Sequence, residues 1–273
     1  MARVGALGVV LFWSASMIWI IAHDVVPRWT ARDVPRFRVG DWLTEDLLRS
    51  QARIEDKYGH RIGTVWSEYR RGQSRLSRSD VIWLESLALV PMQLRIHIRS
   101  EFTAEGDLDE FNLQVFGAGR RVELVCENFS GHLAFRLWVG ERDQFFKVDA
   151  SSLGMVGDVF RPFPTLPEIE VGQSWRIYVV NPLAALSGIG SKMIPMLATV
   201  TRTERLPTDE GSAECFVLET ERARAWVDQH GIVLRQEMDL PVGGTLAIIA
   251  EPFDDRLRDR VLSQELDSGD WNL

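Results

Sequence analysis

The chain is poor in lysine and has no excess of positive charge. Only three of its 31 basic residues are lysine, and the formal net charge of the 273 residues is −8 at pH 7. A nucleic-acid scaffold usually carries a basic face, so this balance argues against that class of protein. The hydrophobic fraction of 45% and the charged fraction of 26% are those of an ordinary folded chain, long enough for one or two domains with a large core.

The sequence also lacks the short motifs of the common enzyme and metal-binding classes. It contains no His-Glu-x-x-His, no Gly-x-Ser-x-Gly, no Walker loop and no Rossmann fingerprint at a strand–helix junction. The run Gly188-Ile189-Gly190-Ser191-Lys192 resembles a phosphate loop only superficially, because its lysine follows the serine instead of preceding it. The five histidines are not grouped with a third ligand. We therefore expect a protein that is not an enzyme and holds neither a metal nor a cofactor.

Cysteine is scarce as well. Cys126 and Cys215 lie far apart and form no Cys-x-x-Cys pair, so neither a zinc ribbon nor a redox dithiol is indicated. Each lies in an apolar, strand-like run, where a buried thiol packs as a small apolar group. A single disulfide between them is the alternative if the domain lies outside the cytoplasm.

One long hydrophobic run is present, at the N-terminus. Residues 4–22, VGALGVVLFWSASMIWIIA, carry no charge, and as a helix they would span about 28 Å, close to the hydrocarbon thickness of a bilayer. This run predicts a membrane helix or a signal sequence. Ser14-Ala15-Ser16 resembles a cleavage site, but the apolar run continues past it, which favours an uncleaved anchor.

The charges around this segment give conflicting indications of its orientation. Arg3 precedes it and four arginines follow it, and these charges alone would keep the large domain in the cytoplasm. Long domains can cross a membrane regardless of charge, however, and a very short N-terminal tail is typical of a signal anchor. We therefore expect a single-pass protein of the inner (cytoplasmic) membrane with a periplasmic large domain. The following arginines are Arg28, Arg32, Arg36 and Arg38.

The chain divides into four parts, of which the third carries the strand signals. Strand-like runs recur there at hairpin spacing, as in 52–70, which turns at Tyr58-Gly59-His60, and in 224–239, which turns at His230-Gly231. Further runs are 81–89 and 197–206. The four parts are an N-terminal membrane anchor or signal helix (1–24), a juxtamembrane linker (25–45), an antiparallel β domain (46–255), and a charged C-terminal tail (256–273) that predicts one or two helical turns and a frayed end.

Alternation within the runs indicates which face is buried. Leu94, Ile96 and Ile98 alternate with polar residues in 92–101, and the same period of two recurs in 108–116 and 132–139. Such alternation over successive strands is typical of an antiparallel meander with one buried and one solvated face. The sequence therefore predicts a mainly β protein.

Two short stretches carry a resemblance to a known family. Val171-Gly172-Gln173-Ser174-Trp175 opens a strand after a proline-rich connection, and Trp226-Val227-Asp228 is followed by Gly231-Ile232-Val233-Leu234-Arg235. With the strand pattern over 50–252, they resemble the lipoprotein-localisation (Lol-type) factors of the bacterial envelope. The resemblance implies a strongly curved antiparallel sheet, or half-barrel, with a short helix or loop covering its concave side. It also implies an apolar ligand such as an acyl chain, or a docked partner, and it offers no catalytic residue to transfer.

The best candidate for that cover is the apolar segment 181–197. Asn181 can cap a short helix with Pro182 in its first turn, and Gly188 can end it. The segment is either a plug that seals the sheet or a movable lid over an apolar groove, in which methionines tolerate varied contacts. Its expected ligand-binding residues are Leu183, Leu186, Ile189, Met193, Ile194 and Met196.

A polar row on one strand is the second candidate site. Arg95, His97 and Arg99 alternate with apolar residues, which places three donors on one strand face where they could hold an anionic group. The alternative is a solvated outer face with cross-strand partners such as Glu110 and Glu123.

Two classes of function remain open at this level. The first is a membrane-anchored, extracytoplasmic binding or carrier module for a lipid or acyl chain. The second is a non-enzymatic structural or interaction subunit of an inner-membrane complex. The expected partners are the membrane, through the N-terminal helix, a lipid or other hydrophobic ligand, and an inner-membrane protein; nucleic acid is not expected.

Overall fold

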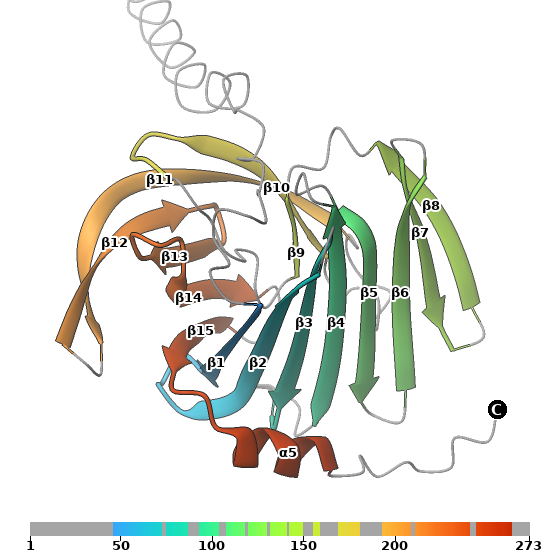
Figure 1. Ribbon diagram of the computed structural model, residues 1–273, viewed down its shortest axis with the longest axis horizontal. Helices are drawn as coiled ribbons and strands as arrows, with labels where there is room; N and C mark the ends of the chain where they lie inside the picture. The colour runs from blue at the N-terminus through green and yellow to red at the C-terminus, as the bar shows by residue number, and fades with distance from the viewer. Residues whose placement is uncertain are drawn as a thin grey trace, which may run out of the picture.

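In the computed structural model the chain forms one strongly curved β-sheet with a short helix packed on its outside (Figure 1). A mainly β fold with a curved antiparallel sheet, as predicted, is thereby confirmed. The structure describes residues 46–72, 75–86, 93–103, 108–117, 120–129, 132–140, 142–149, 155–158, 169–180, 193–208, 211–240 and 244–263.

The described strands fall into two meanders. The first comprises β1 (Leu47–Glu55), β2 (Arg61–Arg71), β3 (Arg75–Leu84), β4 (Leu94–Thr103), β5 (Leu108–Gly117), β6 (Arg120–Phe129), β7 (His132–Val139) and β8 (Arg142–Asp149). The second comprises β9 (Met155–Asp158), β10 (Ser174–Val180), β11 (Met193–Thr208), β12 (Gly211–Glu219), β13 (Ala223–Val227), β14 (Val233–Leu240) and β15 (Gly244–Glu251).

The two meanders join into one open sheet. The fifteen strands of the described part lie in the order β8-β7-β6-β5-β4-β3-β2-β1-β15-β14-β13-β12-β11-β10-β9, with β1 paired to β15 at the junction. Every neighbouring pair is antiparallel except β9 and β10, which are parallel. Figure 1 shows the sheet curling from β8 round through β1 to β11. Within the described residues β8 and β9 do not pair, so the sheet is barrel-like but not closed.

The predicted alternation of buried and solvated residues is confirmed. Leu94, Ile96 and Ile98 are at most 4% exposed, and the apolar residues of the same phase in β5 and β7 are buried too. They belong to one cluster with Trp175 of β10 and Ala225 of β13, on the other meander. Because the sheet curls, the same face of both meanders contributes to a single core. This face is called the inner face below, and the opposite one the outer face.

Two hairpin turns share one design, and both were expected as turns. In each, an aspartate Oδ1 accepts hydrogen bonds from the backbone N–H groups two and four residues later, at 2.8–2.9 Å. The aspartates are Asp56, between β1 and β2, and Asp228, between β13 and β14. Gly59 and Gly231 adopt positive φ angles of 79° and 80°, which glycine reaches without the steric cost of a Cβ. The local sequence therefore fixes both bends.

The described helix, α5 (Asp255–Ser263), covers the outer face rather than the concave side. Its Val261 is buried against Trp66 and Trp83, which alternate in sequence with the inner-face residues Val65 and Ile82. A helix covering the concave side was expected within 181–197. That helix, from Asn181 to Gly188, lies outside the described residues, and so does the rest of 181–192. The end of the segment, from Met193 onward, belongs to β11 and pairs with β10.

A buried glutamine connects this helix to the sheet. The side-chain oxygen of Gln51 accepts hydrogen bonds from the Trp66 indole N–H at 2.7 Å and from the Asp254 backbone N–H at 3.0 Å. Its amide donates to Glu251 at 2.6 Å. Asp254 also caps α5, because its Oδ1 accepts from the Leu257 N–H. One side chain of β1 thus holds the start of α5.

Replacing Gln51 with leucine should lower the free energy of unfolding by about 1–3 kcal/mol, because the buried Trp66 N–H loses its acceptor. Chemical denaturation followed by tryptophan fluorescence measures the loss. The matched control is Gln229→Leu, in an exposed turn, for which we expect a change within about 0.5 kcal/mol. Equal stability of the two variants would contradict this role for Gln51.

Strand boundaries differ from the sequence prediction in two places. The run expected at 81–89 is a strand that begins six residues earlier, at Arg75, and ends at Leu84. The run expected at 197–206 begins at Met193 and extends to Thr208. The predicted membrane segment, residues 4–22, lies outside the described residues. No helix among the residues that the structure describes has the length and apolar character needed to cross a bilayer.

Candidate functional site

The inner face is the candidate site, because it is the largest apolar surface that the fold brings together. Across the first meander its side chains form parallel rows, each row crossing neighbouring strands in register. One row contains Val65, Ile82, Ile96, Val115 and Val122, all at most 1% exposed. Within the described part of the chain, no second sheet and no helix packs against this face. The apolar side chains that the two meanders place on this face belong to one buried cluster.

Two leucines close one end of the inner face by lying on glycines. Gly63, Leu84, Leu94 and Gly117 occupy successive positions of one row on β2 to β5. A Cβ atom built on Gly63 would lie 2.9 Å from the Leu84 side chain, and one on Gly117 would lie 2.2 Å from the Leu94 side chain. Both leucines are completely buried. The absence of a side chain at the two glycines is what lets the leucines pack flat against the sheet.

A polar patch interrupts the inner face toward the other end of the same strands. Arg78 and Asp80 of β3 point inward, in phase with the apolar Ile82. An Arg78 guanidinium nitrogen lies 2.5 Å from an Asp80 carboxylate oxygen, and the guanidinium lies 5.6 Å from the centre of the Tyr69 ring. With their cross-strand neighbours they form the inner polar cluster, namely Ser67, Tyr69, Arg78, Asp80 and Ser100, none of which is more than 6% exposed.

Burying this ion pair is costly. Removing two charges from water carries a desolvation penalty that their mutual attraction often only balances, so a buried ion pair is weak evidence of a stabilising role. Arg78 and Asp80 are the two buried residues with charged side chains in the described part of the chain. The pair lies among apolar neighbours such as Ile98 and Leu76. Sequence reasoning missed it, because the predicted strand began at residue 81.

The predicted polar row of Arg95, His97 and Arg99 lies on the outer face, as the alternation indicated. Arg95 stacks on Trp83, 5.7 Å from the ring centre, and donates a hydrogen bond to the Val261 carbonyl in the last turn of α5. Arg99 forms an ion pair with Glu101 at 2.7 Å. The two arginines thus contact protein groups, and the row as a whole does not converge on a shared space.

His97 is half-buried on this face, edge-on to Phe116 with ring centres 5.9 Å apart. Its Nε2 is buried and has no hydrogen-bond partner among the described residues. Burial, and secondarily the positive charge of Arg95, lowers the pKa of His97. The imidazole is therefore neutral near pH 7 and acts as a packing group.

This environment makes stability depend on pH. The unfolded chain takes up a proton at His97 near pH 6.5 and the folded chain resists it, so the free energy of unfolding should fall as the pH drops below about 6.5. His97 can contribute the uptake of at most one proton on unfolding, which corresponds to a slope of about 1.4 kcal/mol per pH unit. This contribution to the slope should be absent in His97→Gln. Denaturation curves between pH 8 and pH 5 measure it, with His230→Gln in an exposed turn as the control. Parallel curves for wild type and His97→Gln would contradict the assignment.

The predicted apolar lid is described only in part. Leu183, Leu186 and Ile189 lie outside the described residues, and of Met193 and Ile194 the structure describes the strand backbone alone. The remaining candidate, Met196, is half-buried against the core, and the Thr220 hydroxyl lies 3.9 Å from its sulfur. Met196 thus belongs to the strand that forms part of the inner wall.

The two cysteines are free, buried thiols, so the packing alternative is confirmed over the disulfide. Cys126 lies in the inner-face core, whereas Cys215 lies in an outer-face cluster with Val217 and Trp226. The sheet therefore separates them. Burial, with a smaller contribution from the Glu127 carboxylate, raises the pKa of Cys126 to about 12, which keeps the thiol protonated.

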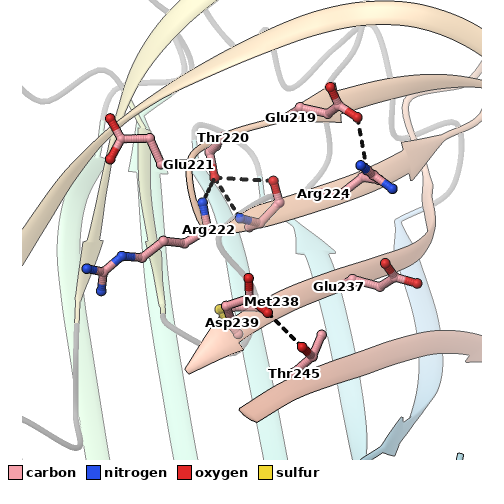
Figure 2. A pocket seen from close by; sticks show the side chains of 10 residues that line it. Glu219, Thr220, Glu221, Arg222, Arg224, Glu237, Met238, Asp239 and Thr245 are labelled. Atoms are coloured by element: carbon pink, nitrogen blue, oxygen red, sulfur yellow. Dashed lines mark hydrogen bonds and ion pairs between the residues drawn. The ribbon is translucent and has the colours of Figure 1, made fainter. Parts of the chain in front are cut away.

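A hollow lies at the turn between β12 and β13, and its volume is about 390 Å³ (Figure 2). The Thr220 hydroxyl accepts hydrogen bonds from two backbone N–H groups of the turn, and Glu219 forms an ion pair with Arg224 at 2.9 Å. Thr245 donates to Asp239 at 2.7 Å. These contacts shape the turn and the adjoining strand ends. The described residues contain no group of three His, Cys, Asp or Glu side chains placed to hold a metal ion.

Comparison with known proteins places the chain in no established family. No protein-family model matches it. A search of curated proteins finds no match either. A solved β-barrel-like protein of the domain of unknown function DUF1849 from Brucella abortus is similar, with 10% identity and a TM-score of 0.46 over 74% of this chain and 94% of that one. A DUF1089 family protein from Pseudomonas aeruginosa has 15% identity and a TM-score of 0.40 over 66% and 90% of the two chains. These likenesses concern the general fold alone.

Proposed function

We propose that the chain is a membrane-anchored, extracytoplasmic module that binds the acyl chain of a lipid on the inner face of its curved sheet. Residues 4–22 anchor it to the inner membrane, and the β domain lies in the periplasm. A curved sheet that holds an apolar ligand is also what the sequence resemblance to the lipoprotein-localisation factors implies.

The extended apolar part of the inner face carries the proposal. Ligand sites for apolar molecules are lined predominantly by hydrophobic side chains, with a few polar groups that fix orientation. Rows such as Val65, Ile82, Ile96, Val115 and Val122 supply the apolar wall. Curved sheets that enclose their inner face are also a common architecture for small apolar ligands.

The open edges supply a route to this face. A closed barrel has no unpaired strand edges, whereas here β8 and β9 end the sheet without pairing in the described part of the chain. The inner-face side chains of both meanders are buried in one cluster, so binding requires the meanders to separate along the seam between β8 and β9. The apolar residues 181–192, which lie between β10 and β11 in the sequence, act as the lid in this proposal.

Stabilisation of the full-length chain by straight-chain alcohols tests the proposal. The protein is held in an amphipathic polymer, and its unfolding temperature is measured with decanol, dodecanol and hexadecanol at equal concentration. Each added methylene group should strengthen binding about fourfold, which corresponds to about 0.8 kcal/mol, and the unfolding temperature should rise with chain length. No rise at any chain length, together with no lipid retained by the purified protein in mass spectrometry, would contradict the proposal.

An interaction subunit of an inner-membrane complex is the second candidate, favoured by two exposed aromatic residues. Phe145 on the edge strand β8 is 62% exposed, and Phe129 at the end of β6 is 72% exposed. Aromatic residues are enriched at protein interfaces. Mild solubilisation should then return a stoichiometric partner with wild type and not with Phe145→Ser. A monomer in several detergents would contradict this candidate.

A further inference from the structure

We infer that the inner polar cluster recognises a lipid head group that is zwitterionic, with separated positive and negative ends and no net charge. The inference rests on the proposed function, because it names the class of lipid that the same inner face takes. The cluster is the polar interruption of that face on β2 to β4, and the acyl chain extends from it over the apolar rows.

The arrangement of the cluster gives the ligand an orientation. Arg78 and Asp80 are two residues apart on β3, so their side chains leave the same face of one strand. Along β3 the inward-facing positions continue from Asp80 into Ile82 and Leu84, which are completely buried. Across the sheet, the row that contains Arg78 and Ser100 continues over β5, β6 and β7 through apolar residues alone. These are Phe111, Cys126 and Phe135. An amphiphile matches this face only with its head group at β3.

The charge of the cluster selects the head group. The guanidinium of Arg78 and the carboxylate of Asp80 cancel, so the buried site is neutral as a whole. A head group with a net charge would add an uncompensated charge to a desolvated site, which is costly. A phosphate joined to an ammonium group adds none. Its phosphate can accept hydrogen bonds from Arg78 in the bidentate manner typical of arginine, and its ammonium can donate to Asp80.

The hydroxyl groups around the pair extend this match. Ser67 is the cross-strand neighbour of Asp80, and Ser100 is the cross-strand neighbour of Arg78. Both serines lie on the inner face and are at most 6% exposed. A hydroxyl both donates and accepts, so each serine can serve either end of a zwitterion. Apolar residues at these two positions would have filled the face without adding hydrogen-bond donors and acceptors.

Competition among three lipids with identical acyl chains tests the inference. The full-length chain in an amphipathic polymer is offered phosphatidylethanolamine, phosphatidylglycerol and diacylglycerol in equal amounts, and native mass spectrometry measures the bound ratio. We expect phosphatidylethanolamine to exceed phosphatidylglycerol about tenfold, because the anionic head group places an unbalanced charge in the cluster. Diacylglycerol should bind less than phosphatidylethanolamine, because it has no charged head group to pair with Arg78 and Asp80.

Two double variants separate recognition from folding. Arg78→Met with Asp80→Leu removes the ion pair and keeps the face filled, and it should bind all three lipids to a similar extent. Arg121→Met with Glu123→Leu removes an ion pair of the same two-residue spacing on the outer face of β6 and should retain the wild-type ratio. Near-ultraviolet circular dichroism confirms that both variants are folded.

The possible outcomes distinguish this inference from the proposed function. Preference for phosphatidylglycerol, or equal binding of all three lipids by wild type, overturns the zwitterion inference and leaves the carrier function standing. Binding of none of the three lipids overturns both. An unchanged ratio in the Arg78→Met, Asp80→Leu variant shows that the cluster does not select the head group and also overturns the inference.

Discussion

Arg78→Met alone should lower the free energy of unfolding by about 3–5 kcal/mol, because it leaves the Asp80 carboxylate without its charged partner in a site that excludes water. Adding Asp80→Leu should restore most or all of the lost stability, since replacing a whole buried ion pair by apolar residues is often neutral or stabilising. Denaturant unfolding of the full-length chain measures wild type and both variants. Arg121→Met, on the outer face, should cost at most about 1 kcal/mol.

The comparison between the single and the double variant is the decisive part of this prediction. A single variant that loses stability and a double variant that recovers it would show that the pair is not retained for folding. That result is what a role in recognition requires. A double variant as unstable as the single one would contradict this account, because the pair would then be needed to hold the sheet together.

Gly63→Ala should have the second large effect, about 3 kcal/mol of lost stability. A Cβ atom at this position would lie 2.3 Å from the Trp83 carbonyl oxygen, a backbone atom of the adjacent strand that cannot move without disturbing the sheet. Alanine reduces the entropy of the unfolded chain and so contributes about 0.4–1 kcal/mol in the opposite direction, which is too little to offset the clash. Thermal or chemical unfolding of the variant measures the net effect.

Gly117→Ala is the matched comparison, because Gly117 occupies the same row on β5, three strands from Gly63 on β2. Its Cβ would also approach another atom closely, at 2.2 Å, but that atom is the terminal methyl group of the Leu94 side chain, which can rotate. We therefore expect a smaller loss than for Gly63→Ala. The reverse order would show that side-chain packing, not backbone contact, limits the approach of these strands.

Much of the fold follows from local sequence. The alternation of Leu94, Ile96 and Ile98 with polar residues indicated the buried phase of β4, because a strand with one face in a core repeats every two residues. The Asp56 and Asp228 turns were also readable, since a glycine follows each aspartate by three residues and the aspartate oxygen accepts two backbone hydrogen bonds. These features depend on neighbours close in sequence.

The candidate site was less accessible to sequence reasoning, because it depends on contacts between distant residues. The inward phase of β3 includes Arg78 and Asp80 together with Leu76 and Ile82. Charged residues are uncommon in the buried phase of a strand, and the run predicted from the sequence began after them, at residue 81. Their burial becomes visible only when β2 and β4 pair on either side. Gln51 is similar, since its partners lie 15 and 203 residues further along the chain.

The position of α5 on the sheet also depends on residues that are distant in sequence. The charged tail predicted one or two helical turns, and α5 confirms a short helix there. Its packing position depends on two tryptophans, Trp66 and Trp83, that share the outer face of β2 and β3. Large aromatic residues in the solvated phase of a strand were the signal that something covers that face. The membrane anchor and the lid function of 181–197 remain predictions.

Photo-crosslinking with an acyl chain tests the central claim most directly. The full-length chain in an amphipathic polymer is incubated with a phosphatidylethanolamine that carries a diazirine at the end of its acyl chain, irradiated, and digested, and the adducts are assigned by mass spectrometry. We expect adducts on inner-face residues such as Leu113, Val115 and Val122, and none on their outer-face neighbours Gln114 and Glu123. Adducts spread over both faces, or confined to residues 4–22, would contradict the claim that the inner face of the sheet binds the lipid.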